Sequence, residues 1–194
     1  VKIRGLNTHN SSTDKISIGQ RAAINIQNID KNKIKRGFQI VDKTFFCGIK
    51  SVIAKIYLLD DAVKEIKKNQ RIRIHLGTSE VIGTVFLFDK KIISSGQQSI
   101  VLINFESPLV AYYKDKFIIR HYSPVFTLGG GEVIFSSTKK NNFLSQESMK
   151  ISHISNLVKL LSNSENNNYI NILIEAYQQN PIYLNDFCLQ IGYK

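Results

Sequence analysis

The chain has 194 residues, of which 43% are hydrophobic and 21% are charged, a composition typical of folded proteins that argues against disorder. Its 26 Lys and Arg residues exceed its 15 Asp and Glu residues, and the net charge is +11. This excess favours a polyanionic partner, RNA first and an anionic membrane surface second, although a merely basic surface is the alternative.

Short apolar runs predict β-strands over the first 135 residues. Turn signals such as Asp60-Asp61 and Ser95-Gly96 separate these runs, and no long helix lies between them. Regularly spaced short strands of this kind favour antiparallel barrels over a parallel α/β sheet. The expected strands cover residues 22–26, 52–59, 71–76, 80–88, 99–105 and 117–120.

A break near residues 41–44 divides this region into two β units. Residues 1–41 offer only about three strands, which are too few to close a barrel. We therefore expect this unit to belong to a larger barrel and to have an open sheet edge.

The character of the sequence changes after Phe135. Residues 136–150 are expected to be a linker, since their first part is polar and basic. Apolar residues then recur at helical spacing, and Asn and Pro residues interrupt them. The pattern predicts three short helices over 151–194, similar to the start of a helix-turn-helix or winged-helix unit.

Sequence motifs for catalysis and metal binding are absent. There is no GxxxxGKS or GxxxxGKT loop, no GxSxG and no HExxH, so we expect no active site. Cys47 and Cys188 lack the four-ligand spacing of a zinc site, and we expect no metal. The chain has only two cysteines and no signal peptide, which fits the reducing environment of the cytoplasm. It also lacks the run of about 18 apolar residues that would predict a membrane span. Gly129–Gly131, between two apolar strands, predicts a tight turn with positive φ rather than a phosphate cradle.

Cationic residues at three places in the sequence are candidates for binding an anion. Arg71, Arg73 and His75 alternate with apolar residues and therefore share one face of a strand, where they would form a phosphate platform. The alternative is a solvated strand face that discourages edge pairing. Arg21 precedes an alternating strand and would present its guanidinium at a barrel rim, unless it is an ordinary surface arginine. Arg120 and His121 end the strand that leads into the glycine segment.

Three stretches of sequence, in this order, resemble the bacterial selenocysteine-specific elongation factors (SelB), relatives of elongation factor Tu. The first combines VKIRGLNTH at 1–9 with GQRAAIN at 19–25. The second is RIRIHLGTSEVIGTVFLFD at 71–89, and the third is ESPLVAYYKDKFIIRHYSPVFTLGGGEVI at 106–134. The resemblance covers about residues 1–135, and the ordered set is more specific than any single stretch.

The resemblance implies a mainly β fold with a helical tail. Residues 1–41 would be the C-terminal part of a second-domain β-barrel, and residues 42–135 a complete third-domain barrel like that of elongation factor Tu. Residues 136–150 would be the linker, and 151–194 the start of a winged-helix extension. The chain would then be a non-enzymatic fragment without the GTPase domain. It would hold no cofactor, since GTP and Mg²⁺ belong to the full-length family.

The resemblance also implies a function, the delivery of selenocysteinyl-tRNA to the ribosome at UGA codons. Arg21 matches the family arginine that helps to hold the selenocysteinyl group, and a cation suits an ionised selenol. Arg120 and His121 would contact the tRNA backbone. The selenocysteine-insertion hairpin of mRNA would be bound by a C-terminal region mostly absent here. The alternatives are a barrel fragment of another translation GTPase and a non-catalytic structural or assembly module.

Overall fold

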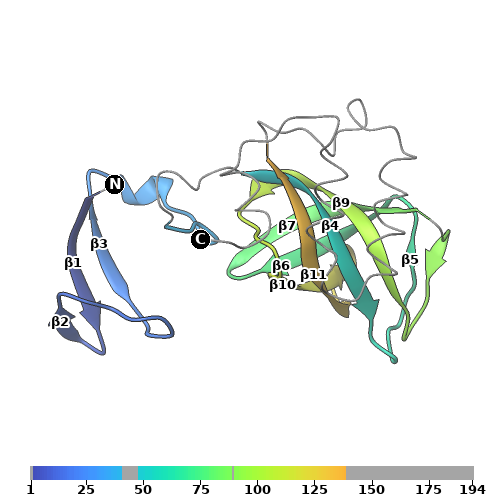
Figure 1. Ribbon diagram of the computed structural model, residues 1–194, viewed down its shortest axis with the longest axis horizontal. Helices are drawn as coiled ribbons and strands as arrows, with labels where there is room; N and C mark the ends of the chain where they lie inside the picture. The colour runs from blue at the N-terminus through green and yellow to red at the C-terminus, as the bar shows by residue number, and fades with distance from the viewer. Residues whose placement is uncertain (1, 41–47, 89, 139–194) are drawn as a thin grey trace, which may run out of the picture. The chain divides into compact units, whose positions relative to one another are not determined.

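The computed structural model describes residues 2–40, 48–88 and 90–138, which form mostly β-structure (Figure 1). The chain divides into two compact units, Val1–Phe38 and Gln39–Lys194. The predicted helices at 151–194 lie outside the described residues, as do both cysteines. Within the described part of the chain, no helix has the length and apolar character needed to cross a membrane.

Unit 1 is a three-stranded antiparallel sheet with the strand order β2-β1-β3. A two-residue turn joins β1 to β2, and its residues His9 and Asn10 have φ values of 48° and 63°. Positive φ at both turn residues is typical of hairpin turns that match the twist of the strands. The elements of this unit are β1 Lys2–Thr8, β2 Ser11–Thr13, β3 Ala23–Gln27 and the 3₁₀ helix η1 Lys31–Lys33.

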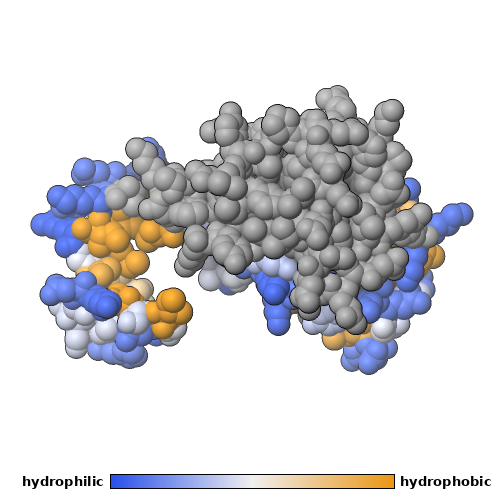
Figure 2. Space-filling model, in the orientation of Figure 1, coloured by the Kyte–Doolittle hydropathy of each residue, from blue (hydrophilic) through white to orange (hydrophobic). Residues whose placement is uncertain are grey.

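Unit 1 has no buried core, because none of its described residues is buried. Its apolar residues pair across the strands, Ile3 with Ile26 and Leu6 with Ile24. Ile3 nevertheless remains 46% exposed and Ile24 37% exposed, and apolar residues are visible on the surface of this unit in Figure 2. The unit has the three strands that the sequence predicts, and its membership of a larger barrel stays a prediction.

Unit 2 contains a closed six-stranded barrel with the strand order β10-β11-β4-β9-β7-β6, in which all neighbouring strands are antiparallel. The predicted antiparallel barrel is therefore confirmed for this unit. A separate two-stranded sheet pairs β5 Ile66–Lys67 with β8 Ile92–Ile93. The barrel strands are β4 Ile49–Leu58, β6 Gln70–Leu76, β7 Ser79–Leu87, β9 Gln98–Leu109, β10 Lys116–His121 and β11 Thr127–Thr138.

The barrel core is built by strand alternation. Along β6 and β7 every second residue is buried, so one face of each strand points into the barrel. Burial of these mainly aliphatic side chains is the main favourable term in folding. The largest fully buried side chains are Ile53, Ile56, Ile66, Ile72, Ile74, Ile93, Ile103, Ile119, Leu128 and Phe135.

Gly129–Gly131 lie inside strand β11, so the predicted tight turn with positive φ at these glycines is wrong. The turn between β10 and β11 is made by residues 122–126, and the His121 N–H donates to the Phe126 carbonyl across it at 2.8 Å. The glycines are needed for close packing instead. A Cβ on Gly129 would overlap the carbonyl oxygen of Tyr57 on β4, and one on Gly131 would overlap the Phe117 ring. β11 also continues to Thr138, into the segment expected to be linker.

Candidate nucleic-acid interface

Strand β6 presents cationic side chains on the outer wall of the barrel. Arg71 is exposed and Arg73 and His75 are half-buried, whereas Ile72 and Ile74 between them are buried in the core. The structure thus places the three predicted residues on one face, as the period of two requires. Their role in binding RNA stays a prediction.

Arg71 is held by a carboxylate from another strand. Its Nε donates to Oε1 of Glu106 on β9 at 2.8 Å, and its Nη2 lies 2.7 Å from the same oxygen. This hydrogen bond raises the pKa of Arg71 above its ordinary value. Exposed ion pairs add little stability. The main consequence of the pair is therefore a fixed orientation of the guanidinium.

Arg73 forms a second ion pair, in which its Nη1 lies 2.6 Å from Oε1 of Glu80 on β7. The hydrogen bond from Arg73 lowers the pKa of Glu80, and the nearby charges of His75, Arg73 and Arg120 lower it further. His75 is directly opposite Glu80 in the β6–β7 register. One carboxylate therefore lies in the field of three cationic or potentially cationic side chains.

Tyr122, the first residue after β10, connects the two arginines. The guanidinium carbon of Arg71 lies 4.4 Å from the centre of the Tyr122 ring, and that of Arg73 lies 5.4 Å from it. Both distances are within the range of cation–π attraction. Arg73 Nε also donates to the Tyr122 carbonyl at 3.0 Å. The β10–β11 turn is thereby tied to the cationic face of β6.

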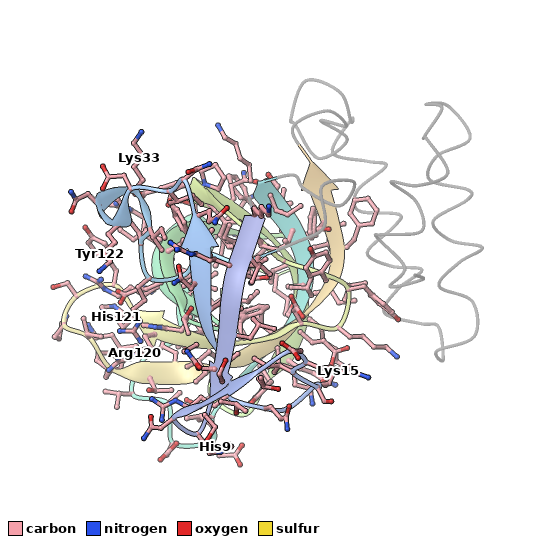
Figure 3. The ribbon with its side chains drawn as sticks, turned by 90° about the vertical axis from the view of Figure 1, so that its left-hand side faces the viewer. His9, Lys15, Lys33, Arg120, His121 and Tyr122 are labelled. Atoms are coloured by element: carbon pink, nitrogen blue, oxygen red, sulfur yellow. The ribbon has the colours of Figure 1, made fainter. Side chains whose placement is uncertain are left out.

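Arg120 and His121 end strand β10, and Figure 3 shows them next to Tyr122. Arg120 pairs with Arg73 on β6, which adds a third arginine to this wall. The His121 ring stacks on Phe126, with ring centres 4.8 Å apart and planes inclined by 8°. Its Nδ1 is 3.0 Å from the carbonyl oxygen of Pro124. His121 therefore stabilises the turn, while Arg120 belongs to the cationic wall.

Two nitrogen atoms of this wall have no hydrogen-bond partner among the described residues. They are Nε2 of His75 and Nε of Arg120, and both atoms are shielded from solvent. A buried polar atom without a partner costs about 1–3 kcal/mol. His75 on β6 and Arg120 on the adjacent strand β10 each carry such a nitrogen. No hydrogen bond among the described residues offsets its loss of hydration.

Arg21 belongs to unit 1. It is exposed and precedes β3, and its carbonyl oxygen accepts a hydrogen bond from Oγ1 of Thr8 at 2.9 Å. This bond fixes the backbone next to Arg21 and leaves the guanidinium at the surface. Its place at a barrel rim and its role in binding both stay predictions.

Sequence reasoning missed Glu80, Glu106 and Tyr122. A signal for Glu80 was present, because the two-residue turn at Gly77 and Thr78 sets a register in which Glu80 faces His75. Glu106 is 35 residues from Arg71, and no local pattern connects them. Tyr122 reaches the arginines only because the barrel places β10 beside β6.

We call Arg71, Arg73, Arg120 and Tyr122 the arginine cluster. Its three guanidinium groups face two carboxylates, which leaves one formal positive charge uncompensated. Guanidinium groups that are oriented in advance suit phosphate oxygens, which they bind through paired N–H donors. Across residues 2–40, 48–88 and 90–138, no group of three His, Cys, Asp or Glu side chains is arranged to hold a metal ion.

Comparison with known proteins assigns this barrel to a family. Residues 53–140 match the family described as selenocysteine-specific elongation factor, beta-barrel domain. The selenocysteine-specific elongation factor of Desulfomicrobium baculatum is 24% identical over 69% of this chain and 21% of its own length. That of Haemophilus influenzae is 22% identical over 73% of this chain and 22% of its own length. The chain thus spans about a fifth of these relatives.

A solved structure has the same fold. The crystal structure of the bacterial selenocysteine-specific elongation factor EF-Sec matches 97% of this chain and 28% of its own, with a TM-score of 0.73 and 21% identity. The family match, the two relatives and the shared fold agree with one another. Residues 53–140 therefore form a β-barrel domain of the type found in selenocysteine-specific elongation factors.

Proposed function

We propose that this chain is part of a translation elongation factor that delivers selenocysteinyl-tRNA to the ribosome at UGA codons. The observation that carries the proposal is the family match over residues 53–140, a range that contains the entire arginine cluster. The net charge of +11 supports a nucleic-acid partner. GTP and Mg²⁺ would be bound by a separate GTPase domain of the full-length factor, and the selenocysteine-insertion mRNA hairpin by a C-terminal region. The proposed place of action is the cytoplasm.

The arginine cluster would contact the tRNA backbone. Phosphate contacts position a nucleic acid without reading its sequence, and they release condensed counterions. Glu80 and Glu106 hold two guanidinium groups in place before the tRNA arrives. Less conformational freedom is then lost on binding. Arg21 would hold the selenocysteinyl group.

A salt titration of tRNA binding tests the role of the cluster. We expect the affinity of the chain for selenocysteinyl-tRNA to fall with salt, and Arg120→Ala to reduce the slope of log K against log salt by about one. Lys64→Ala, which removes an exposed charge outside the cluster, is the matched control and should preserve the slope. An absence of salt-sensitive binding, or an unchanged slope in Arg120→Ala, would contradict the proposed contact.

The role of Arg21 requires the full-length factor. Arg21→Ala should reduce its preference for selenocysteinyl-tRNA over seryl-tRNA, because the selenol is ionised at neutral pH and the hydroxyl is not. Arg4→Ala, another exposed arginine of unit 1, should leave the preference unchanged. Equal discrimination in the Arg21→Ala variant and the wild type would exclude this role.

A further inference from the structure

A row of side chains crosses four neighbouring strands on the outer wall of the barrel. Tyr57 on β4 pairs with Gly130 on β11, Gly130 pairs with Ile118 on β10, and Ile118 pairs with His75 on β6. We call these four residues the Tyr57 row. With adjacent strands about 4.8 Å apart, the row is about 14 Å long.

Gly130 makes this row flat at its centre. A Cβ on Gly130 would lie 2.8 Å from Oη and 3.0 Å from Cζ of Tyr57, so the phenol lies across the bare backbone of the glycine. Tyr57 is nevertheless 53% exposed, and Ile118 beside it is 52% exposed. The row therefore offers an aromatic ring and an adjoining apolar side chain to a ligand.

Cationic side chains lie on both sides of the row. Each of these cations is two positions along its strand from a residue of the row, a distance of about 7 Å. Arg73 and Arg120 lie on one side of the row, and Lys55 and Lys116 lie on the other. Two carboxylates face the same area. Glu80 opposes His75 and is bound by Arg73, and Glu132 pairs in register with both lysines. Four positive charges against two negative ones leave the surroundings cationic.

We propose that the Tyr57 row binds an unpaired nucleotide, whose base stacks on the Tyr57 ring while flanking phosphates contact the cations on either side. This inference rests on the proposed function and adds a base contact to it. In an RNA duplex the bases are paired and stacked inside the helix. A protein that contacted only the phosphate backbone of a duplex would therefore leave the exposed Tyr57 ring without a partner. Aromatic rings between basic residues are typical of surfaces that bind single-stranded nucleic acid, because every base has a π-face.

A fluorescent variant tests stacking directly. The chain contains no tryptophan, so Tyr57→Trp introduces a single reporter. We expect a single-stranded RNA oligonucleotide to quench its emission and inorganic polyphosphate of equal charge to leave it unchanged. Ile92→Trp, on β8 outside the row and 38% exposed, is the matched control and should not respond to either ligand.

Affinity provides the second measurement. Tyr57→Leu should weaken binding of the single-stranded oligonucleotide by about 5- to 150-fold, the usual effect of losing one base–aromatic stack, whereas Tyr57→Phe should bind like the wild type. Binding of a duplex RNA should be the same in all three proteins. Circular dichroism confirms that each variant keeps its strand content.

The possible outcomes separate this inference from the proposed function. If tRNA binds with a salt slope that depends on Arg120 but the Tyr57→Trp emission does not change with RNA, the stacking site is overturned and the backbone contact stands. If no RNA binds, both are overturned. Emission that shifts with protein concentration alone would make the row a protein–protein contact and would also overturn the inference.

Discussion

Gly129 is the position at which one added methyl group should harm the barrel most. Its Cβ would overlap the Tyr57 carbonyl oxygen and lie 2.9 Å from Cα of Leu58, so the backbone of β4 would have to move. Overpacking costs about 1–3 kcal/mol and a lost backbone hydrogen bond about 1 kcal/mol. Alanine also restricts the unfolded chain more than glycine does, and this offsets about 0.4–1 kcal/mol of the cost. We therefore expect Gly129→Ala to lower the free energy of unfolding by about 1–3.5 kcal/mol.

The neighbouring Gly130 supplies the control. Its added methyl group would meet the tip of the Tyr57 side chain, which is flexible and half-exposed, and not backbone. Gly130→Ala should change the free energy of unfolding by less than about 1 kcal/mol. Urea unfolding followed by far-UV circular dichroism measures both variants. Equal unfolding midpoints for the two would refute the argument that the close approach of β11 to β4 requires a glycine at 129.

Two further predictions concern pH. The pKa of Glu80 is lower in the folded chain than in the unfolded chain. The stability contributed by its pair with Arg73 is therefore present at neutral pH and is lost as the pH falls below about 4. In urea unfolding, Glu80→Gln should differ from the wild type only above that pH. Burial raises the pKa of Asp115, so its ionisation destabilises the fold, and stability is gained as the pH falls through the folded-state pKa. Asp115→Asn retains an acceptor for the Tyr112 N–H. We expect this variant to be more stable than the wild type at pH 7 by about a few tenths of a kcal/mol, and equally stable in acid. A variant that is less stable than the wild type at pH 7 would contradict this.

Strand positions and faces followed from local patterns. Alternation of apolar and charged residues along β6 is sufficient to place Arg71 and Arg73 outside and Ile72 inside, because successive side chains of a strand point to opposite faces. The glycine segment shows the limit of such reasoning. Glycine is used both in turns and at strand positions that another backbone approaches closely. Only the pairing of β11 with β4, about 70 residues earlier, distinguishes the two.

The sequence by itself determined that this chain is built from antiparallel strands, which side chains enter the barrel, and which family it resembles, because these depend on local periodicity and on residue order. The tertiary structure decided what each cation touches. Closure of the barrel places β10 beside β6, and this contact brings Tyr122 over Arg71 and Arg73. The pairing of β11 with β4 on one side and β10 on the other sets Gly130 between Tyr57 and Ile118. Such contacts join residues far apart in sequence, and no local pattern encodes them.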